Sequence, residues 1–394
     1  MSLIGQEVTV VGAGVAGLAV ARALALRGAS VTVLEQADAI REVGAGLQIS
    51  PNGAAVLRAL GLQSGLDAAS VRAQAVELID GPSGAGVTRL DLARLRPGQG
   101  YHFLHRTDLI GLLLTAATDA GVRLRLLSRV EAVDLSGPRP AIVLGGGERV
   151  ETPLLIGAEG LHSRLRTALN GDEQPFFTGQ VAWRAIIPAE PGAAPVVEVH
   201  MGPGRHLVSY PLRGGTLRNI VAVEERSRWV EESWTLRDDP MDLRLAFAGY
   251  SPRVRGWLDR VEDPWLWGLF RHPVADHWTQ SLPNGAVAIL GDAAHPTLPF
   301  LAQGASMGLE DAWVLAAALA KHDTVDAAMA AYQIARKPRT TRIVAAANGN
   351  ARAYHLSGLP RLVGHTGLRM LGRLSPGLML SRFDWLYGHD VTVG

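Results

Sequence analysis

The sequence predicts an α/β fold in which a β-rich domain interrupts an α/β domain, and a mainly helical C-terminal part completes that domain. Three observations support this prediction. The first residues alternate strand, glycine-rich turn, helix and strand, as a parallel βαβ unit does. Residues 175–270 carry alternating apolar positions, most of the aromatic residues and several prolines, which is typical of an antiparallel sheet. From residue 286 the strand-to-helix pattern resumes, and the chain stays mainly helical to about residue 380.

The N-terminal elements follow one another closely. Glu7–Val11 is a short β-branched run, which predicts a buried parallel strand. Alanine, leucine and valine fill residues 15–26, which predict a helix that ends at Gly28. Ser30–Leu34 predicts a second strand, a glycine-rich polar stretch follows, and residues 54–60 return to helix.

The changes in sequence pattern also predict where the chain passes between the two domains. We expect the α/β domain to comprise residues 1–70, 101–174 and 281–394. The β-rich domain would comprise residues 71–100 and 175–280.

Composition excludes several classes of protein. The 394 residues carry a formal net charge of +1, with 19% charged and 47% hydrophobic residues, which excludes disorder and gives no overall basic field for nucleic acid. The chain has no cysteine, which excludes disulfides, thiolate nucleophiles and cysteine-ligated metals, and no metal site is expected. The apolar stretch over residues 8–26 contains Arg22 and three glycines, so we do not interpret it as a membrane helix. We expect a cytoplasmic globular protein that binds neither nucleic acid nor a membrane.

The strongest motif is the turn Gly12-Ala-Gly14-Val-Ala16-Gly17, which follows a strand and opens a helix. Gly12 permits the tight turn, Gly14 lets the backbone approach a pyrophosphate, and Gly17 lets the helix lie close to the strand. Glu35, at the end of the next strand, would accept hydrogen bonds from ribose hydroxyls. The pattern predicts a bound dinucleotide, FAD or NAD rather than NADP, because an acid at this position disfavours a 2′-phosphate.

A second motif comes late in the chain. A buried strand ends in Gly291-Asp292, and a loop that begins near Pro296 leads to a helix near Gly304. Asp292 at the end of a strand can meet a sugar-like chain of hydroxyls, although a capping aspartate is the alternative. The following helix can place its positive N-terminal dipole near developing negative charge. We interpret the basic stretch 336–339 as a solvated helix end.

Several of these residues stand in the order seen in one enzyme family. They are the glycine turn with Glu35, then Arg41, Arg106, the Gly157-Ala-Glu-Gly160 turn and the Gly291-Asp292 pair. In this order the chain resembles the FAD-dependent aromatic hydroxylases, which are single-component class A flavoprotein monooxygenases. The stretch Phe383-Asp-Trp-Leu-Tyr-Gly-His-Asp390 is similar to the C-terminus of the salicylate and 3-hydroxybenzoate hydroxylase branch. The resemblance covers nearly the whole chain.

The resemblance implies a Rossmann-like domain that binds FAD non-covalently and a β-sheet domain that holds the substrate. Glu35 would bind the adenosine ribose, and Arg41 and Arg106 would lie near the ribose and phosphates of FAD. Asp292 would bind the ribityl chain. The loop from Pro296 to Gly304 would lie against the isoalloxazine.

The resemblance also implies the reaction. NADH or NADPH would reduce FAD, the reduced flavin would react with O2 to give a C4a-hydroperoxide, and its distal oxygen would hydroxylate a hydroxybenzoate-like phenolic acid. The protein would position the ring, exclude water and tune protons. One residue departs from the family pattern, because Glu159 stands where aspartate is usual. Glu159 either keeps a role in handling FAD and the pyridine nucleotide or is a solvated turn residue.

Two residues of the β-rich domain are candidates for catalysis. In an extended strand, His206, Val208 and Tyr210 share one face, so an imidazole and a phenol could together accept and pass on the proton of a substrate phenol. Similar positions occur in the hydroxybenzoate and hydroxynicotinate hydroxylases that the chain resembles. The alternative is a surface histidine and a core tyrosine at a strand edge.

Three further residues are candidates for binding the substrate. Gln48 follows a glycine-rich turn and could hydrogen-bond a substrate oxygen, or it could be an ordinary loop residue. Pro299 and Phe300 lie in the loop before the last motif's helix, where relatives often carry His, Gln or Tyr. Because Phe300 cannot exchange a proton, the pocket could be drier or shaped for a different ring.

Three functions remain open from the sequence. The leading one is hydroxylation of a hydroxybenzoate-like acid. The second is hydroxylation of a larger phenolic or polyketide substrate, and the third is a non-catalytic flavin-binding redox protein. We expect a monomer or a homodimer.

Overall fold

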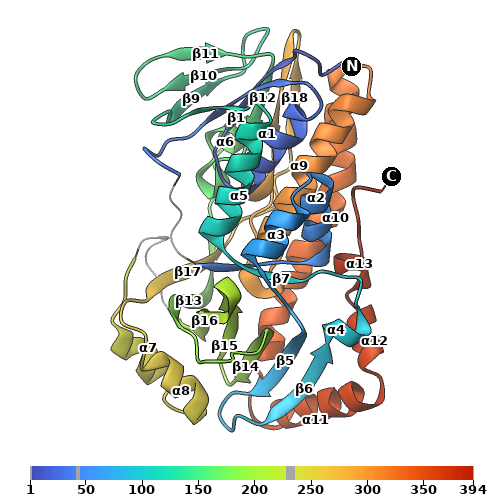
Figure 1. The fold of residues 1–394 in the computed structure, drawn as a ribbon. Helices are drawn as coiled ribbons and strands as arrows, with labels where there is room; N and C mark the ends of the chain where they lie inside the picture. The colour runs from blue at the N-terminus through green and yellow to red at the C-terminus, as the bar shows by residue number, and fades with distance from the viewer. Residues whose placement is uncertain (1, 41–44, 228–235, 394) are drawn as a thin grey trace.

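The computed structural model describes residues 2–40, 45–227 and 236–393, and it has the predicted fold class (Figure 1). A six-stranded sheet has the order β18-β19-β12-β1-β2-β8. Its strands run parallel from β19 to β8, and β18 is antiparallel to β19. Because parallel strands end at one edge, the loops after β1, β2, β12 and β19 lie close together. The strands are β1 (Glu7–Val11), β2 (Ser30–Leu34), β8 (Arg123–Arg125), β12 (Leu154–Gly157), β18 (Thr279–Leu282) and β19 (Gly285–Ile289).

Helices α1 (Val15–Ala25), α5 (Arg106–Asp119) and α9 (Gly304–Lys321) pack together beside this sheet in one large apolar core. The helix predicted over residues 54–60 is α2 (Pro51–Ala59), which begins three residues earlier than predicted. Proline is well suited to the first turn of a helix, where its missing N–H has no partner to lose. The shorter helices beside this sheet are α3 (Gln63–Ala69), α6 (Arg164–Asn170) and the 3-10 turn η1 (Gly160–His162).

A seven-stranded sheet has the order β17-β13-β16-β15-β14-β5-β6. One face packs against helices α7 (Pro240–Ala246) and α8 (Pro252–Leu258), where Leu207 and Trp183 lie in the core. The opposite face carries Tyr210 and packs against Phe103 and the C-terminal helices. The alternation of a strand therefore places His206 and Tyr210 on the face away from α7 and α8. The strands are β5 (Ala75–Asp80), β6 (Gly86–Asp91), β13 (Phe176–Pro188), β14 (Val196–Gly202), β15 (Arg205–Leu212), β16 (Leu217–Glu225) and β17 (Trp265–Arg271).

Two three-stranded sheets make up the rest of the sheet structure that the described residues form. The sheet β3-β7-β4 lies between the two large sheets, so it joins Gln48 on one strand to the start of α5 on another (Figure 1). The sheet β11-β10-β9 packs beside α6 at the far end of the molecule. The strands are β3 (Gly46–Ile49), β4 (Val71–Arg72), β7 (His102–His105), β9 (Val130–Asp134), β10 (Ala141–Leu144) and β11 (Arg149–Glu151).

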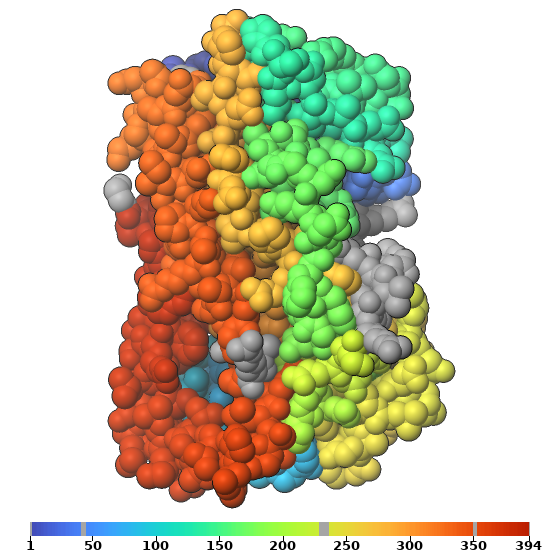
Figure 2. Space-filling view, turned by 180° about the vertical axis from the view of Figure 1, so that it is seen from behind, coloured from blue at the N-terminus to red at the C-terminus, as the bar shows by residue number. Residues whose placement is uncertain are grey.

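Helix α10 (Val325–Tyr354) connects the two halves of the molecule. At 30 residues it is about 45 Å long, and it runs from β18 and β19 of the six-stranded sheet to the seven-stranded sheet. Seen from behind, the helices after residue 304 cover one side of the molecule, and a hollow opens beside them (Figure 2). The remaining elements are α4 (Leu92–Leu95), η2 (Arg213–Gly215), η3 (Gly291–Ala293), η4 (Pro299–Leu301), α11 (Gly358–Leu374), α12 (Pro376–Ser381) and α13 (Asp384–Tyr387). Among the described residues, no helix is both long and apolar enough to span a membrane.

Candidate active site

The glycine turn between β1 and α1 is open at one glycine, and protein atoms lie close against the other two. Gly12 has a φ of +101°, and a Cβ there would clash with the carbonyl of Ala158. A Cβ at Gly17 would clash with the carbonyl of Gly12, which shows how closely the helix lies on the turn. A Cβ at Gly14 would meet nothing within 4 Å. The turn therefore offers an open approach to its backbone at Gly14, as a bound pyrophosphate requires.

Backbone amides hold the carboxylate of Glu35 beside this turn. Ala13 N donates to Oε2 at 2.9 Å, and Ala37 N donates to Oε1 at 3.0 Å. Two such bonds fix the side chain at the end of β2, so its remaining lone pairs can accept from a ribose. Ala16, predicted as part of the cofactor site, has its Cβ against Gly308 and Gly291, so it also spaces α1 from α9.

Asp292 lies in η3 directly after β19. Its side chain is exposed, yet burial among protein atoms raises the pKa of its carboxyl, against the lowering effect of His295 and Arg106. Gly291 takes a φ of +60° here, and its N–H donates to Asp311 Oδ2 at 3.0 Å.

A buried charged network supports this turn from α9 and α10. Asp311 is fully buried and accepts from Gly291 N, from His295 Nε2 and from Arg336 Nε at 2.7 Å. Although burial opposes ionisation, His295 and Arg336 hold the pKa of Asp311 at about 2. Glu310 pairs with Arg336 and with Arg339. The interpretation of residues 336–339 as a solvated helix end is wrong, because two buried acids on α9 draw both arginines into the core.

Glu159, at the departure from the family pattern, caps α6. Its carboxylate accepts from Ser163 Oγ at 2.5 Å and from the backbone N–H groups of Arg164 and Leu165 at 3.2 and 3.3 Å. Burial raises the pKa of its carboxyl despite these bonds. Glu159 is therefore not a fully solvated turn residue. Its side chain points to the N-terminus of α6 and not to the glycine turn.

Arg106 begins α5, and its N–H donates to the carbonyl of Ala45 at 2.9 Å. It lies close enough to Asp292 and to Arg184 to influence the pKa of both. The structure thus brings Arg106 to the edge where Asp292 lies. Arg41 lies outside the described residues.

The loop from Pro296 to Gly304 joins this edge to the seven-stranded sheet. Pro296 is buried, Pro299 is exposed, and Gly304 begins α9. Phe300 is 8% exposed and packs with apolar residues of β13, β16 and β17. Its ring centroid is 5.6 Å from that of His206.

Gln48 and Tyr210 form one polar group with two residues that the sequence did not single out. Tyr101 Oη donates to Gln48 Oε1 at 2.7 Å, and Gln48 and Arg184 both lie close enough to Tyr210 to lower its pKa. Arg184 Nη2 donates to the carbonyl of Gly46 at 2.7 Å, and its guanidinium stacks on Trp267. Burial raises the pKa of Tyr210 to about 12, although Arg184 and Gln48 oppose the rise. Tyr210 is therefore a neutral phenol at physiological pH.

His206 belongs to a different hydrogen-bonded group. Its Nδ1 is 2.7 Å from Nε2 of His355, and Nδ1 of His355 is 2.7 Å from Oε1 of Glu225. No hydrogen bond joins His206 to Tyr210 among the described residues. The two are four residues apart on one strand, which is about 13 Å along its axis, so they share a face without forming a contacting pair.

Sequence reasoning missed Arg184, Tyr101, His355 and Asp311. Arg184 follows Trp183 in a strand of alternating apolar residues, and this pattern gives no sign that the arginine faces the interior. His355 ends a helix 149 positions after its partner His206, a pairing that only the folded chain makes. Glu310 and Asp311 lie in the helix that begins at Gly304, and the basic residues 336–339 lie in the next helix. Two adjacent acids followed by a basic stretch in the next helix were the signal that could have indicated this network.

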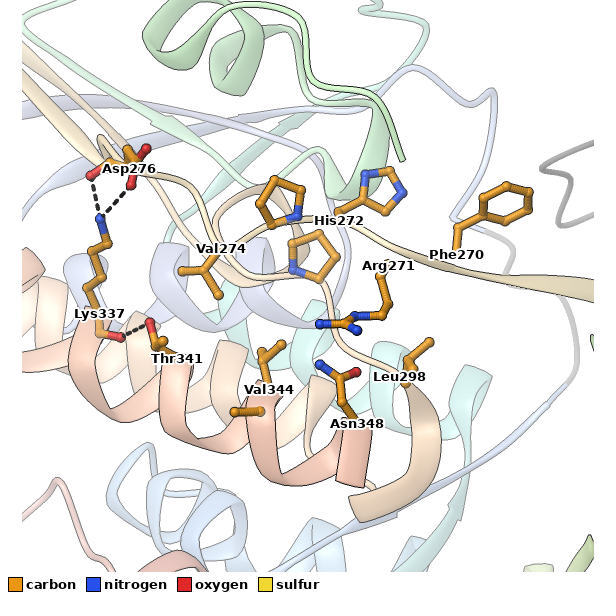
Figure 3. A pocket seen from close by; sticks show the side chains of 13 residues that line it. Phe270, Arg271, His272, Val274, Asp276, Leu298, Lys337, Thr341, Val344 and Asn348 are labelled. Carbon is orange, nitrogen blue, oxygen red and sulfur yellow. Dashed lines mark hydrogen bonds and ion pairs between the residues drawn. The ribbon is translucent and has the colours of Figure 1, made fainter. Parts of the chain in front are cut away.

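A separate pocket of about 350 Å³ adjoins the site (Figure 3). Pro296 and Leu298 form part of its wall, and the end of β17, residues 272–276 after it and helix α10 form other parts. Arg271 and Asn348 line it, and Lys337 at its margin is 3.2 Å from Asp276 Oδ1. Of the predicted site residues that the structure describes, Pro296 alone lines this pocket, so the pocket lies beside the site.

Comparison with known proteins decides the family. The family model for an FAD binding domain matches residues 6–347. A 3-amino-4-hydroxybenzoate 2-monooxygenase of Streptomyces platensis is 33% identical over 398 residues, which cover 98% of this chain and 96% of that protein. The 3-hydroxybenzoate 6-hydroxylase of Klebsiella oxytoca is 35% identical, with 96% of each chain covered. The chain belongs to the FAD-dependent aromatic hydroxylases. It is an FAD-dependent monooxygenase that hydroxylates an aromatic ring.

Solved structures agree with this fold. HpxO of Klebsiella pneumoniae, complexed with FAD and uric acid, has a TM-score of 0.82 at 24% identity, with 96% of this chain and 95% of that chain covered. A salicylate hydroxylase substrate complex has a TM-score of 0.80 at 22% identity, with 98% and 96% covered. The residues of this hydroxylase fit FAD, because the open approach at Gly14, the fixed Glu35 carboxylate and the accessible Asp292 carboxylate line one edge of the six-stranded sheet.

Proposed function

We propose that this flavoprotein hydroxylates a phenolic aromatic acid of the hydroxybenzoate class, with NADH or NADPH and O2 as co-substrates. The observation that carries the proposal is Arg184. This guanidinium is desolvated, which lowers its pKa, and it forms no ion pair with an acid of the described residues. Its Nε is buried without a hydrogen-bond partner there. A partly buried cation in this state favours an anionic ligand, and a carboxylate matches its planar donors.

The groups around Arg184 suit the rest of such a molecule. Tyr210 and Gln48 can hydrogen-bond a carboxylate or a phenolic oxygen, and Phe300 supplies an apolar wall beside His206. The related proteins from Streptomyces platensis and Klebsiella oxytoca are named for hydroxybenzoate substrates, which supports the same class.

Within this proposal, each part of the chain has a defined task. Glu35, Arg106, Asp292 and the glycine turn would hold FAD, which supplies the hydride acceptance and oxygen activation when bound. Arg184 would orient the substrate carboxylate, and Tyr210 would position an oxygen on the ring. His206 would accept the phenolic proton, which makes the ring carbons ortho and para to that oxygen more nucleophilic.

The test compares acids with their neutral analogues. Holoenzyme is mixed with NADH or NADPH and with 3-hydroxybenzoate, 3-amino-4-hydroxybenzoate, salicylate, 3-hydroxybenzamide or a larger bicyclic phenol. Stimulated NAD(P)H oxidation and the hydroxylated product are measured. A charged hydrogen bond of about 1.5–3 kcal/mol predicts that 3-hydroxybenzoate binds roughly 10- to 150-fold more tightly than its amide. Equal binding of acid and amide, or hydroxylation of the larger phenol alone, would contradict the proposal.

A variant pair assigns the preference to one residue. Arg184→Gln should remove the preference for the acid while FAD content stays high. Arg253 is the matched control, because it also stacks on a tryptophan of the β-rich part but is 54% exposed and paired with Glu198. Arg253→Gln should keep the preference. If both variants keep it, Arg184 does not bind the carboxylate.

A further inference from the structure

A continuous chain of three ionisable side chains leads from His206 to the protein surface. His206 is 1% exposed, and the side chains of His355 and Glu225 are 3% and 53% exposed. Both hydrogen bonds in the chain measure 2.7 Å. The members come from β15, the C-terminal end of α10 and the end of β16. A buried imidazole is thus joined to an exposed carboxylate through one intervening imidazole.

The chemistry of these groups decides which nitrogen carries each proton. An ionised carboxylate only accepts hydrogen bonds, so Nδ1 of His355 must donate to Glu225. A neutral His355 then has an unprotonated Nε2, which accepts from His206. His206 must therefore carry its proton on Nδ1, and its Nε2 keeps a lone pair. That Nε2 makes no hydrogen bond within the described part of the chain.

We propose that His206, His355 and Glu225 form a proton relay, in which Glu225 sets the tautomer of His206 and the chain carries the substrate's phenolic proton to the surface. The proposal rests on the proposed function, since it needs a phenolic substrate at His206. His355 and Glu225 act through His206 and are positioning residues.

The transfer moves one proton in and one proton out. The substrate O–H bond breaks and a bond forms from its proton to Nε2 of His206. The Nδ1 proton of His206 passes to Nε2 of His355, and the Nδ1 proton of His355 passes to Glu225. Solvent then removes that proton from the exposed carboxylate. No oxidant or reductant takes part, and the substrate is left as a phenolate.

The surroundings favour passing the proton on over storing it. Burial and the neighbouring His355 lower the pKa of His206, and burial also lowers the pKa of His355 despite the opposing effect of Glu225. Among the residues that the structure describes, the other charged or titratable groups near the pair are Tyr354 on α10, Arg205 on β15 and Glu224 on β16. Arg205 further lowers the pKa of His355 and is itself paired with Glu224. A stable imidazolium is therefore disfavoured at both histidines, so a proton that reaches His206 moves outward.

The tautomer can be tested without any substrate. Holoenzyme labelled with 15N-histidine gives separate signals for protonated and unprotonated ring nitrogens, and His206→Gln identifies the signal of His206. We expect Nδ1 of His206 to be protonated and Nε2 to be unprotonated at neutral pH. Glu225→Gln should shift this towards a mixture of tautomers, because an amide can donate as well as accept. A protonated Nε2 in the unaltered enzyme would overturn the proposal.

Proton transfer is tested by stopped flow. Oxidised holoenzyme in weak buffer with a pH indicator is mixed with 3-hydroxybenzoate, and proton release and phenolate absorbance are followed. His355→Gln is the sharpest variant, because its amide can accept from His206 and donate to Glu225 but cannot pass a proton. We expect release to slow at least about tenfold in His355→Gln and Glu225→Gln, in line with general-base contributions. The matched control Glu224→Gln removes the same charge from the neighbouring residue and should release protons at the unaltered rate.

The outcomes separate the relay from the function. Normal release in His355→Gln, or equal slowing in Glu225→Gln and Glu224→Gln, would overturn the relay while the unaltered enzyme still hydroxylates 3-hydroxybenzoate. If the unaltered enzyme hydroxylates no phenolic acid, the proposed function fails, and the 15N tautomer still decides whether Glu225 orients His206.

Discussion

Asp311→Asn should destabilise the protein strongly although the substitution hardly changes the shape of the side chain. Asp311 has a fully buried side chain and accepts from Arg336, His295 and the N–H of Gly291. Asparagine keeps one acceptor oxygen, loses the charge and turns an NH2 group towards donors. Removing one partner of a buried ion pair costs about 3–5 kcal/mol. Arg336 keeps Glu310, so we expect the lower end, about 3 kcal/mol.

The pH dependence gives an independent check on this value. The pKa of Asp311 is about 2 in the folded protein and about 3.9 in an unfolded chain, so its ionisation contributes on the order of 2–3 kcal/mol. Because the folded pKa is the lower one, this stabilisation is fully present above about pH 5. It is lost as the pH falls through about 4 towards 2. The difference between the unaltered protein and Asp311→Asn should therefore narrow in that window.

The assay is urea unfolding followed by tryptophan fluorescence at pH 7 and pH 3. A loss of about 3 kcal/mol lowers the urea midpoint by about 1 M for a slope of about 3 kcal/mol/M. The control is Asp276→Asn, because the Asp276 side chain is 86% exposed and pairs with Lys337 of the same helix α10. Exposed pairs contribute about 0–1 kcal/mol, so its midpoint should barely move. If Asp311→Asn lies within 1 kcal/mol of the control at pH 7, the buried network does not support the Gly291-Asp292 turn as argued.

Three further predictions follow from the site. Heat or acid should release free FAD into the supernatant, because the chain has no cysteine and no histidine is among the residues assigned to FAD; flavin retained in the precipitate would contradict non-covalent binding. Glu35→Ala and Asp292→Ala should each weaken FAD binding by roughly 1–3 kcal/mol in a flavin-fluorescence titration, and the two losses should nearly add because they concern distant parts of one cofactor. In Tyr210→Phe, flavin reduction should persist while hydroxylation falls by roughly 10² or more and hydrogen peroxide rises, and His206→Ala should do the same. If NAD(P)H oxidation stays fully coupled to product in both variants, Tyr210 and His206 contribute only packing and the prediction is wrong.

The cofactor side of this protein is largely local in sequence. The Gly12–Gly17 turn, Glu35 and the Gly291-Asp292 pair each directly follow a strand of the six-stranded sheet. Parallel strands end at a common edge, so a strand-by-strand reading places these groups together before any packing is known. This prediction needs only the spacing of the glycines and the position of one acid, because the backbone conformation of the turn and of the strand end determines where these residues stand.

The substrate side depends on contacts that no local pattern encodes. Alternation along β15 correctly places His206 and Tyr210 on one face. Residues from remote segments then place the two side chains in separate polar groups. His206 meets His355 from α10, whereas Tyr210 meets Gln48 and Arg184. The burial of Arg336 has the same origin, since two acids on α9 face it across a helix pair. The sequence by itself determined the fold class and the position of the glycine turn, Glu35 and Asp292 at one edge of the six-stranded sheet, because both follow from backbone geometry over short spans. Only the tertiary structure decided the partners of each buried charge, because the cost of burying a charge is offset by whichever groups the whole fold brings within hydrogen-bonding distance.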